Sequence, residues 1–394
     1  MAEIPVSAQR RAHCAATAGV ALALLVAADT CAAAVESYGI VDTSVVYTRN
    51  SGRAPDRIEL QSGSLSGSRI GIRGVEALGG GSAAVFRLEN GFNAGTGGMN
   101  QGRRLFGRQS YAGLRTPGGH TFVAGRLYDP LTDLVQPLQG DGYLGQTFST
   151  PGDVDNADAS ARLERAVKWT SPSAGGWQAS AIAALGGVPG AAGSGLAHGA
   201  ALAYRRRPFA AALGYLRVDL GNPAHAHRGA SSADSLFNSA VNAAYASAAS
   251  VHIVRVAAQY AAGAITAGGY YSDARYRPDH ASRFGARSSP RSGITQVYRN
   301  ASVYGLWQAT PALSALVAYN HLRACGDSAA RYRQVSAGGS YLLSRRTDFY
   351  AMAGYAHASG SNGRGAAQAV VGATGVDAGG PSQLRVNAGL RHRF

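Results

Sequence analysis

The sequence ends in QLRVNAGLRHRF (383–394), in which two sets of residues alternate up to the last position. One face carries Leu384, Val386, Ala388, Leu390, His392 and Phe394, and the other carries Gln383, Arg385, Asn387, Gly389, Arg391 and Arg393. Alternation with a period of two predicts a β-strand with one apolar face. The ends of soluble domains usually fray. A terminal aromatic residue on the apolar face therefore favours a closed barrel, in which the last strand pairs with the first.

The same alternation recurs upstream, in residues 39–47, 68–76 and 83–92. In 68–76, Ile70 and Ile72 alternate with Arg69, Gly71 and Arg73. In 83–92, Phe86 and Leu88 alternate with Arg87 and Glu89. Strands of about 9–11 residues with one lipid-compatible face are typical of transmembrane barrels.

The predicted connections alternate in length. Short turns are predicted at 77–82, 116–119, 171–176, 205–208, 261–263, 309–312 and 344–348. Longer polar segments lie at 49–58, 93–102, 128–160, 187–197, 220–249, 278–297, 325–330 and 359–383, and 220–249 could contain further strand. Short turns at one rim and long loops at the other are typical of outer-membrane barrels. The pattern predicts sixteen antiparallel strands around a water-filled lumen.

The connection 128–160 is unusually long, because loops above about 12–15 residues are rare in compact domains unless they have a function. It contains three prolines and the acids Asp129, Asp133, Asp141, Asp153, Asp155 and Asp158. It either extends into solvent or folds into the barrel and narrows it. We expect the second.

The N-terminus has the pattern of a secretory signal peptide. Arg10 and Arg11 precede the apolar run 15–28, and Ala32–Ala34 provide small residues for cleavage. A transmembrane anchor is the alternative, but the run is shorter than the ~20 residues that a spanning helix needs. We therefore expect residues 1–34 to be a signal peptide and residues 35–394 to form the barrel.

The predicted mature chain contains no apolar run long enough for a membrane helix, which leaves a closed barrel as the way to cross lipid. A soluble periplasmic all-β domain is the competing interpretation. The formal net charge of +15 is almost entirely arginine, with Lys168 as the single lysine. These charges are spread through the strands, which favours a charged pore interior over a nucleic-acid surface.

The sequence gives little support for a catalytic site or a cofactor site. No GxSxG is present, and the glycine-rich turns lack a following helix pattern. His225 and His227 lie in a predicted loop without a carboxylate constellation, so we expect neither a catalytic nor a metal site. Cys325 remains as the one cysteine after removal of 1–34, which excludes an internal disulfide. We predict no enzyme activity and no cofactor.

The chain resembles the trimeric general porins of the Gram-negative outer membrane, in particular their arginine-rich branch. The resemblance rests on YGIVD (38–42), LSGSRIGIRG (65–74), FRLENGF (86–92), RLFGRQSYAGL (104–114), AGRLYD (124–129), AVKWTSPSAGG (166–176), RQVSAGGSYLLSRRTDFYAMAGY (333–355) and AGLRHRF (388–394). It implies a sixteen-stranded barrel, a homotrimer, and a third loop, here 128–160, folded into the lumen as a constriction.

The resemblance also implies which residues form that constriction. Arg69 and Arg108 match arginines of the positive wall, and Lys168 or Arg165 falls near its third position. Glu89 matches an inward acid, and Asp129 and Asp133 open the inward loop. Arg73 shares the lumen parity of Arg69, whereas the parity of Arg126 points toward a subunit contact.

The implied function is passive diffusion of small hydrophilic solutes and ions, with lipid and a homotrimer as partners. The arginine excess predicts a preference for anions. A solute-specific channel, or an adhesin or receptor that binds through its long loops, is the alternative. The sequence alone leaves both open.

Overall fold

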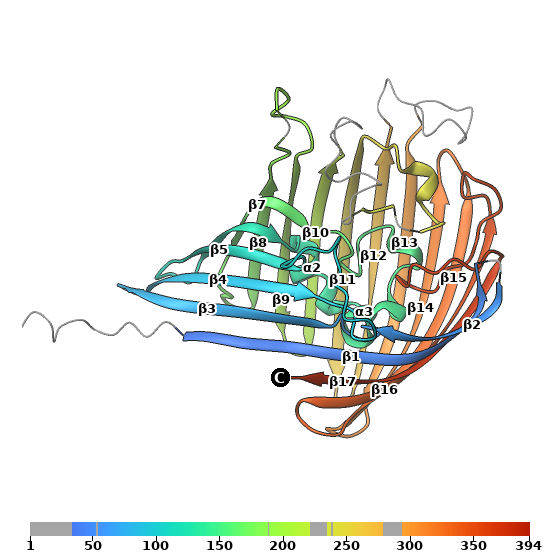
Figure 1. Cartoon of the computed structure of the whole chain (residues 1–394), viewed down its shortest axis with the longest axis horizontal. Coiled ribbons are helices and arrows are strands. Elements are labelled where there is room, and N and C mark those ends of the chain that lie inside the picture. Colours follow the sequence, from blue (N-terminus) through green and yellow to red (C-terminus); the bar gives the residue numbers. More distant parts are fainter. Residues whose placement is uncertain (1–33, 53, 188, 221–234, 238, 279–293) are drawn as a thin grey trace, which may run out of the picture.

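The computed structural model describes residues 34–394, apart from 53, 188, 221–234, 238 and 279–293. The strands are β1 (Ala34–Ser51), β2 (Ala54–Ser62), β3 (Arg69–Gly79), β4 (Ser82–Gly91), β5 (Gln109–Arg115), β6 (Thr121–Leu127), β7 (Leu163–Thr170), β8 (Trp177–Ala184), β9 (Ala197–Arg206), β10 (Phe209–Asp219), β11 (Ser250–Ala262), β12 (Ile265–Arg277), β13 (Gln296–Gln308), β14 (Leu313–Cys325), β15 (Ala330–Leu342), β16 (Thr347–Gly360) and β17 (Ser382–Arg393). They form one antiparallel sheet that curves around a lumen (Figure 1). Pairing of β1 with β17 closes it.

The segments β2 and β3 share one position in the wall. Residues 43–51 of β1 pair with β2, and residues 34–40 of the same strand pair with β3. Between them, residues 63–68 leave the sheet, beginning at Gly63 with a φ of 81°. The described strand segments therefore fill sixteen wall positions, which confirms the predicted sixteen-stranded antiparallel barrel.

The predicted loop at 49–58 is wrong. The chain reverses between Ser51 and Ala54, and strand continues on both sides. Most of β2 is exposed on both faces. Ile58 and Leu60 share the outward face with Val45 and Tyr47, but residues 49–57 are polar or small, so the alternation is not visible in the predicted segment.

The other connections follow the predicted alternation. All seven predicted short turns join neighbouring strands, and the long connections lie at the opposite ends of those strands. The described part of 220–249 contains no strand, only the short 3-10 helix η5 (Ala243–Tyr245). Among the described residues, no helix is long and apolar enough to cross a membrane. The predicted signal segment, apart from Ala34, and most of the loops 220–249 and 278–297 lie outside the described residues.

The outer face of the barrel is apolar between two aromatic belts. Near the short turns the belt contains Trp177, Tyr204, Phe209, Tyr260, Trp307, Tyr341 and Phe349. Near the long loops it contains Tyr215, Tyr271, Tyr319 and Tyr355. Aromatic girdles of this kind mark the two membrane interfaces. Tyr270 and Tyr304 do not belong to either belt, because both point into the lumen and are buried there.

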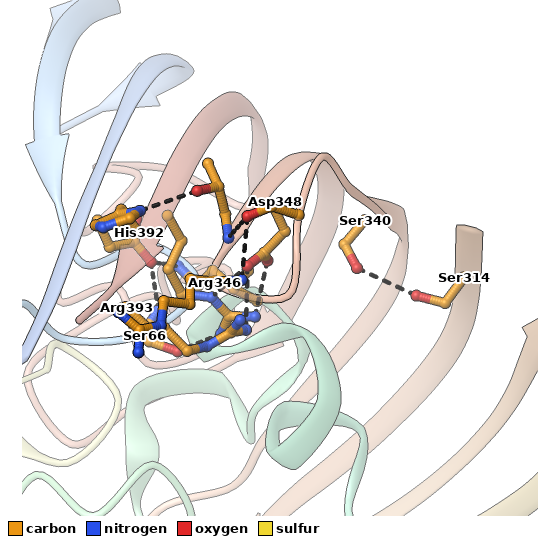
Figure 2. Close-up of polar contacts among 12 residues, drawn as sticks. Ser66, Ser314, Ser340, Arg346, Asp348, His392 and Arg393 are labelled. Carbon is orange, nitrogen blue, oxygen red and sulfur yellow. Dashed lines mark hydrogen bonds and ion pairs between the residues drawn. The ribbon is translucent and has the colours of Figure 1, made fainter. Parts of the chain in front are cut away.

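The pairing of β16 with β17 is supported by an ion cluster around a buried carboxylate. Asp348 on β16 is fully buried and binds Arg391 at 2.8 Å and Arg393 at 3.0 Å (Figure 2). Arg391 also donates to Ser66 Oγ at 2.6 Å, and His392 lies 2.9 Å from Thr347 on the outer side. A carboxylate shared by two arginines fixes the register of β17 more strongly than neutral contacts would.

Phe394 supports the closing pair of β17 with β1 on the lipid side. Its backbone N–H donates to Gly39 O at 3.1 Å, and the N–H of Gly39 donates to Phe394 O at 3.0 Å. The ring lies over Gly39 and fills the space that a Cβ there would take. An aromatic ring covering a strand glycine shields backbone that would otherwise face lipid. The predicted outward parity of Phe394 is thus confirmed.

Replacing Phe394 with Ala uncovers the Gly39 backbone at the closing pair. We expect a several-fold decrease in folded, heat-modifiable barrel in outer-membrane fractions, measured by electrophoresis with and without boiling. Leu390→Ala is the matched control, because Leu390 is an exposed outward residue of the same strand that covers no glycine. Equal yields of the two variants would contradict the role assigned to the terminal ring.

Candidate pore constriction

The loop 128–160 lies inside the barrel. It contains α2 (Pro130–Leu134), η1 (Gln136–Leu138), α3 (Gly140–Leu144), η2 (Gln146–Phe148) and η3 (Pro151–Asp153). Figure 1 shows α2 and α3 within the ring of strands. Wall side chains donate to carbonyls of the loop, including Tyr304 to Leu138 at 3.1 Å, Tyr276 to Val154 at 2.7 Å and Gln334 to Thr147 at 2.8 Å.

Small residues on the inner wall make room for the loop. On β9 and β10 the buried inner positions include Ala201, Ala203, Ala210 and Ala212. The side chain of Leu131 packs directly over Gly214. Apolar residues of the loop thus bury against an apolar strip of wall, which would otherwise face water. The loop covers this side of the lumen and leaves the opening on the other side.

Asp129 starts the loop as the N-cap of α2. Its carboxylate accepts from the backbone N–H of Leu131 at 2.8 Å and of Thr132 at 3.2 Å, and from Asn156 Nδ2 at 3.0 Å. It is 1% exposed. Asp129 therefore orders the loop. The expectation that it faces the open lumen is corrected.

The opening is a cavity of about 770 Å³ between the loop and the wall of β3–β5. Its charged lining residues are Arg69, Arg87, Arg108, Arg162, Asp133, Asp141 and Asp158. The arginines of the wall, Arg69, Arg87 and Arg108, face the three acids of the loop across it. Residues of the 63–68 segment, including Ser66, also line it.

Arg108 and Glu89 form a buried ion pair at the wall. Arg108 Nε lies 2.8 Å from Glu89 Oε1, and Tyr38 donates to Glu89 Oε2 at 2.8 Å. Arg108 comes just before β5 begins, so it does not follow the alternation that points Ser110 and Ala112 outward. Its side chain points inward. Arg69 lines the same cavity and donates through Nε to Gly67 O at 2.9 Å.

Lys168 and Arg165 have different positions. Lys168 is buried on the inner face of β7 and binds Asp133 Oδ2 at 2.5 Å and Tyr128 O at 3.1 Å. Arg165, with a φ of 55°, is exposed and donates to Gly186 O. Of the two candidates, Lys168 is thus the one beside the lumen loop, and Arg165 is excluded from the constriction.

Arg73 has the predicted inward parity but lies outside the cavity. It forms an exposed ion pair with Glu36 at 2.8 Å and lies over the ring of Tyr38, with its Cζ 5.3 Å from the ring centre. It is four residues closer to the short-turn rim than Arg69, about 13 Å along a strand. The predicted place of Arg73 at the constriction is therefore not supported.

Residues 14–361 match the Gram-negative porin family. The chain belongs to this family. A porin of this kind is a channel of the Gram-negative outer membrane and not an enzyme.

Two curated relatives support the assignment. The porin is 32% identical to an outer membrane porin protein of Bordetella pertussis over 36% of its own length. It is 40% identical to outer membrane porin protein 32 of Delftia acidovorans over 22%. These matches span 40% and 26% of the relatives' lengths. In fold, the porin is similar to an anion-selective porin from Comamonas acidovorans, with a TM-score of 0.68, 21% identity, and coverage of 92% of this chain and 100% of that one.

Several charged residues at the cavity were not predicted as site residues. The inward parity of Arg87, shared with Glu89, was visible in the sequence. The positions of Arg162, Asp141 and Asp158 at the cavity depend on how the loop folds.

Burial changes the pKa of two acids on this loop, which lies outside the spanning strands. It raises the pKa of Asp141 to about 7. Burial, reinforced by the negative charge of Asp153, raises the pKa of Asp158 well above its usual range.

Asp129 should respond to substitution as a helix cap and not as a residue of the cavity lining. Asp129→Ala removes the cap of α2, at a cost of roughly 1 kcal/mol. We expect a noisier single-channel current with an unchanged reversal potential, because Asp129 does not line the cavity. Asp129→Asn keeps a capping oxygen and serves as the control, with quiet currents. A shifted reversal potential in Asp129→Asn would contradict this placement.

Proposed function

We propose that the porin passes small hydrophilic solutes and ions by passive diffusion and that it prefers anions. The observation that carries this proposal is the set of charges on the cavity, which is lined by four arginines and three aspartates. Arginine stays protonated at physiological pH. The raised pKa values of Asp141 and Asp158 reduce the opposing negative charge.

The physical basis is field focusing. In a narrow aqueous opening between low-dielectric walls, charge of one sign concentrates its counter-ions. Charges at the rim contribute less, since salt screens them over ~8 Å. We therefore assign selectivity to Arg69, Arg87, Arg108 and Arg162. Glu89 orients Arg108, and Lys168 orients Asp133. The description of a structurally similar porin as anion-selective supports this proposal.

Reversal potentials in a KCl gradient test the selectivity. We expect the wild type to prefer chloride, and Arg69→Ser together with Arg108→Ser to lower the chloride-to-potassium permeability ratio several-fold. Because Arg108 neutralises buried Glu89, the second substitution is combined with Glu89→Gln. Arg73→Ser is the matched control, since Arg73 lies on the same strand and parity as Arg69 but outside the cavity.

A cation-selective wild type would overturn the proposed preference. An unchanged ratio after loss of Arg69 and Arg108 would overturn the assignment of these residues. Conductance that saturates with one solute would favour the alternative of a solute-specific channel.

We propose that three copies assemble side by side through the outer face of β3–β6. β5 and β6 have seven residues each, fewer than the 9–11 that a strand needs to span lipid. A wall this short exposes polar backbone at its end unless protein covers it. Its outer face also has an apolar groove of about 200 Å³, lined by residues that include Gly74, Phe86, Ala112 and Gly113.

Substitution in this groove tests the assembly. Ala112→Arg places a charge against the neighbouring copy, and we expect it to convert a three-chain particle into single chains in native mass spectrometry. Ala301→Arg is the control, because Ala301 is an outward residue of β13, far along the sheet from this face. A single-chain mass for the wild type would contradict the trimer.

We also propose that residues 1–34 are removed on export. The apolar run 15–28 and the small residues Ala32–Ala34 support this proposal. N-terminal sequencing of the outer-membrane protein should recover a start within two residues of Val35. A sequence from residues 10–25 would contradict the signal peptide.

A further inference from the structure

The last long connection, residues 361–381 between β16 and β17, folds into the barrel as well. Its middle part, residues 369–374, is largely buried. Ala369 and Val370 are 0% exposed and belong to an apolar cluster that also contains Tyr332 of β15. We call residues 369–374 the inner turn.

Backbone hydrogen bonds join the inner turn to the loop 128–160. The N–H of Gly152 donates to Gly372 O at 2.8 Å. The N–H of Ala373 donates to Gln146 O at 3.0 Å. Gln146 and Ala373 both line the cavity that forms the opening. The two loops therefore meet at the edge of the opening.

Amide side chains of the wall hold both loops at this place. Buried Gln334 of β15 donates through Nε2 to Thr147 O at 2.8 Å. Its Oε1 accepts from the N–H of Gly372 at 2.7 Å. Buried Gln383 of β17 accepts through Oε1 from the N–H of Val371 at 2.9 Å. A buried donor or acceptor without a partner is costly, so these contacts fix the inner turn against the wall.

Glycine at position 372 makes the contact between the loops possible. Its φ is 55°, in the left-handed region that most side chains disfavour. A Cβ at Gly372 would overlap the carbonyl oxygen of Gln146. Gly375 on the same connection has a similar φ of 67°, but a Cβ there would meet no atom within 4 Å. The two glycines therefore differ in what they touch and share the same kind of backbone conformation.

The same connection is also bound at the long-loop end of the barrel. Asn362 Nδ2 donates to Ala240 O at 2.8 Å, and Asp377 Oδ1 accepts from the N–H of Ala240 at 3.1 Å. Arg364 donates to Ala243 O, at the start of η5, at 2.8 Å. The connection thus reaches from the long-loop rim down to the opening and is fixed at both levels.

We propose that the inner turn is a positioning element of the pore, which holds residues 146–152 of the loop 128–160 in place and so sets the width of the opening. This inference rests on the proposed channel function. Residues 146–152 consist mainly of η2 and the start of η3, and each of these helices is three residues long. Helices this short make few hydrogen bonds of their own, so partners outside them fix their position. The inner turn supplies such partners beside the cavity.

Single-channel recording of Gly372→Ala in planar bilayers tests the contact. The added methyl group separates the inner turn from Gln146, so we expect a several-fold increase in the current fluctuations of the open pore. Gly375→Ala is the matched control, because it places the same methyl group at a similar φ without a neighbour. Its currents should be as quiet as those of the wild type.

A second variant removes the inner turn from the opening. Residues 370–377 are replaced by a Gly-Ser-Gly-Ser linker, which can join the remaining ends because the N–H of Ala378 donates to Ala369 O at 3.0 Å. We expect larger neutral polyethylene glycols to enter this pore than the wild-type pore, measured by their effect on its conductance. Only heat-modifiable, folded preparations are compared, so a folding defect cannot imitate a wider opening.

Equal fluctuations in Gly372→Ala and Gly375→Ala would overturn the role of the contact between the two loops. An unchanged polymer size limit in the shortened variant would overturn the role of the inner turn in setting the width. Both readouts compare a variant with the wild-type channel and are independent of the sign of the ion preference. A cation-selective wild type would therefore count against the proposed function and not against the inner turn.

Discussion

The rest of the structure depends on the pairing of β1 with β17. Lipid offers no hydrogen bonds, so every backbone donor and acceptor in the wall must find its partner in a neighbouring strand, and an open edge would be costly. The seam therefore receives support on both faces. Inside, Arg391 of β17 donates to Ser66, whose backbone N–H donates to Asp42 of β1; outside, Phe394 lies over Gly39. Without this closure there is neither a protected sheet nor an enclosed lumen for the loop 128–160 to fill.

The second constraint is that the loop carbonyls inside the lumen need donors. Wall residues from distant strands supply them. Arg255 of β11 donates to Asp155 and Asn156, Tyr304 of β13 to Leu138, and Gln334 of β15 to Thr147. The loop is thus attached around much of the inner circumference, and the alanine-rich faces of β9 and β10 take its apolar side. Its acids are presented to the arginines of β3 and β4 because the remaining lumen wall is already occupied.

The period-two pattern was sufficient for the barrel, because lipid and lumen impose opposite demands on successive residues. It failed at 49–58, because residues 49–57 are polar or small and the apolar alternation begins only at Ile58. At the constriction, strand parity located Arg69 and Glu89. Parity could not distinguish the roles of the two acids at the start of the loop. Asp129 caps α2 and Asp133 binds Lys168, and these contacts depend on how the loop folds. Arg162 was missed for the same reason, whereas Arg87 was open to prediction from its parity with Glu89.

The interruption between β2 and β3 links the opening to the ends of the chain. Asp42 of β1 accepts from the backbone N–H of Ser66 at 2.6 Å and from the hydroxyl of Tyr350 on β16 at 2.5 Å, and Arg391 of β17 reaches Ser66 as well. The 63–68 segment, which lines the cavity, thus takes its shape from the first and the last strands of the barrel. The cavity has its full lining only when β1 and β17 have paired, so the event that closes the sheet also forms the opening through which solutes would pass.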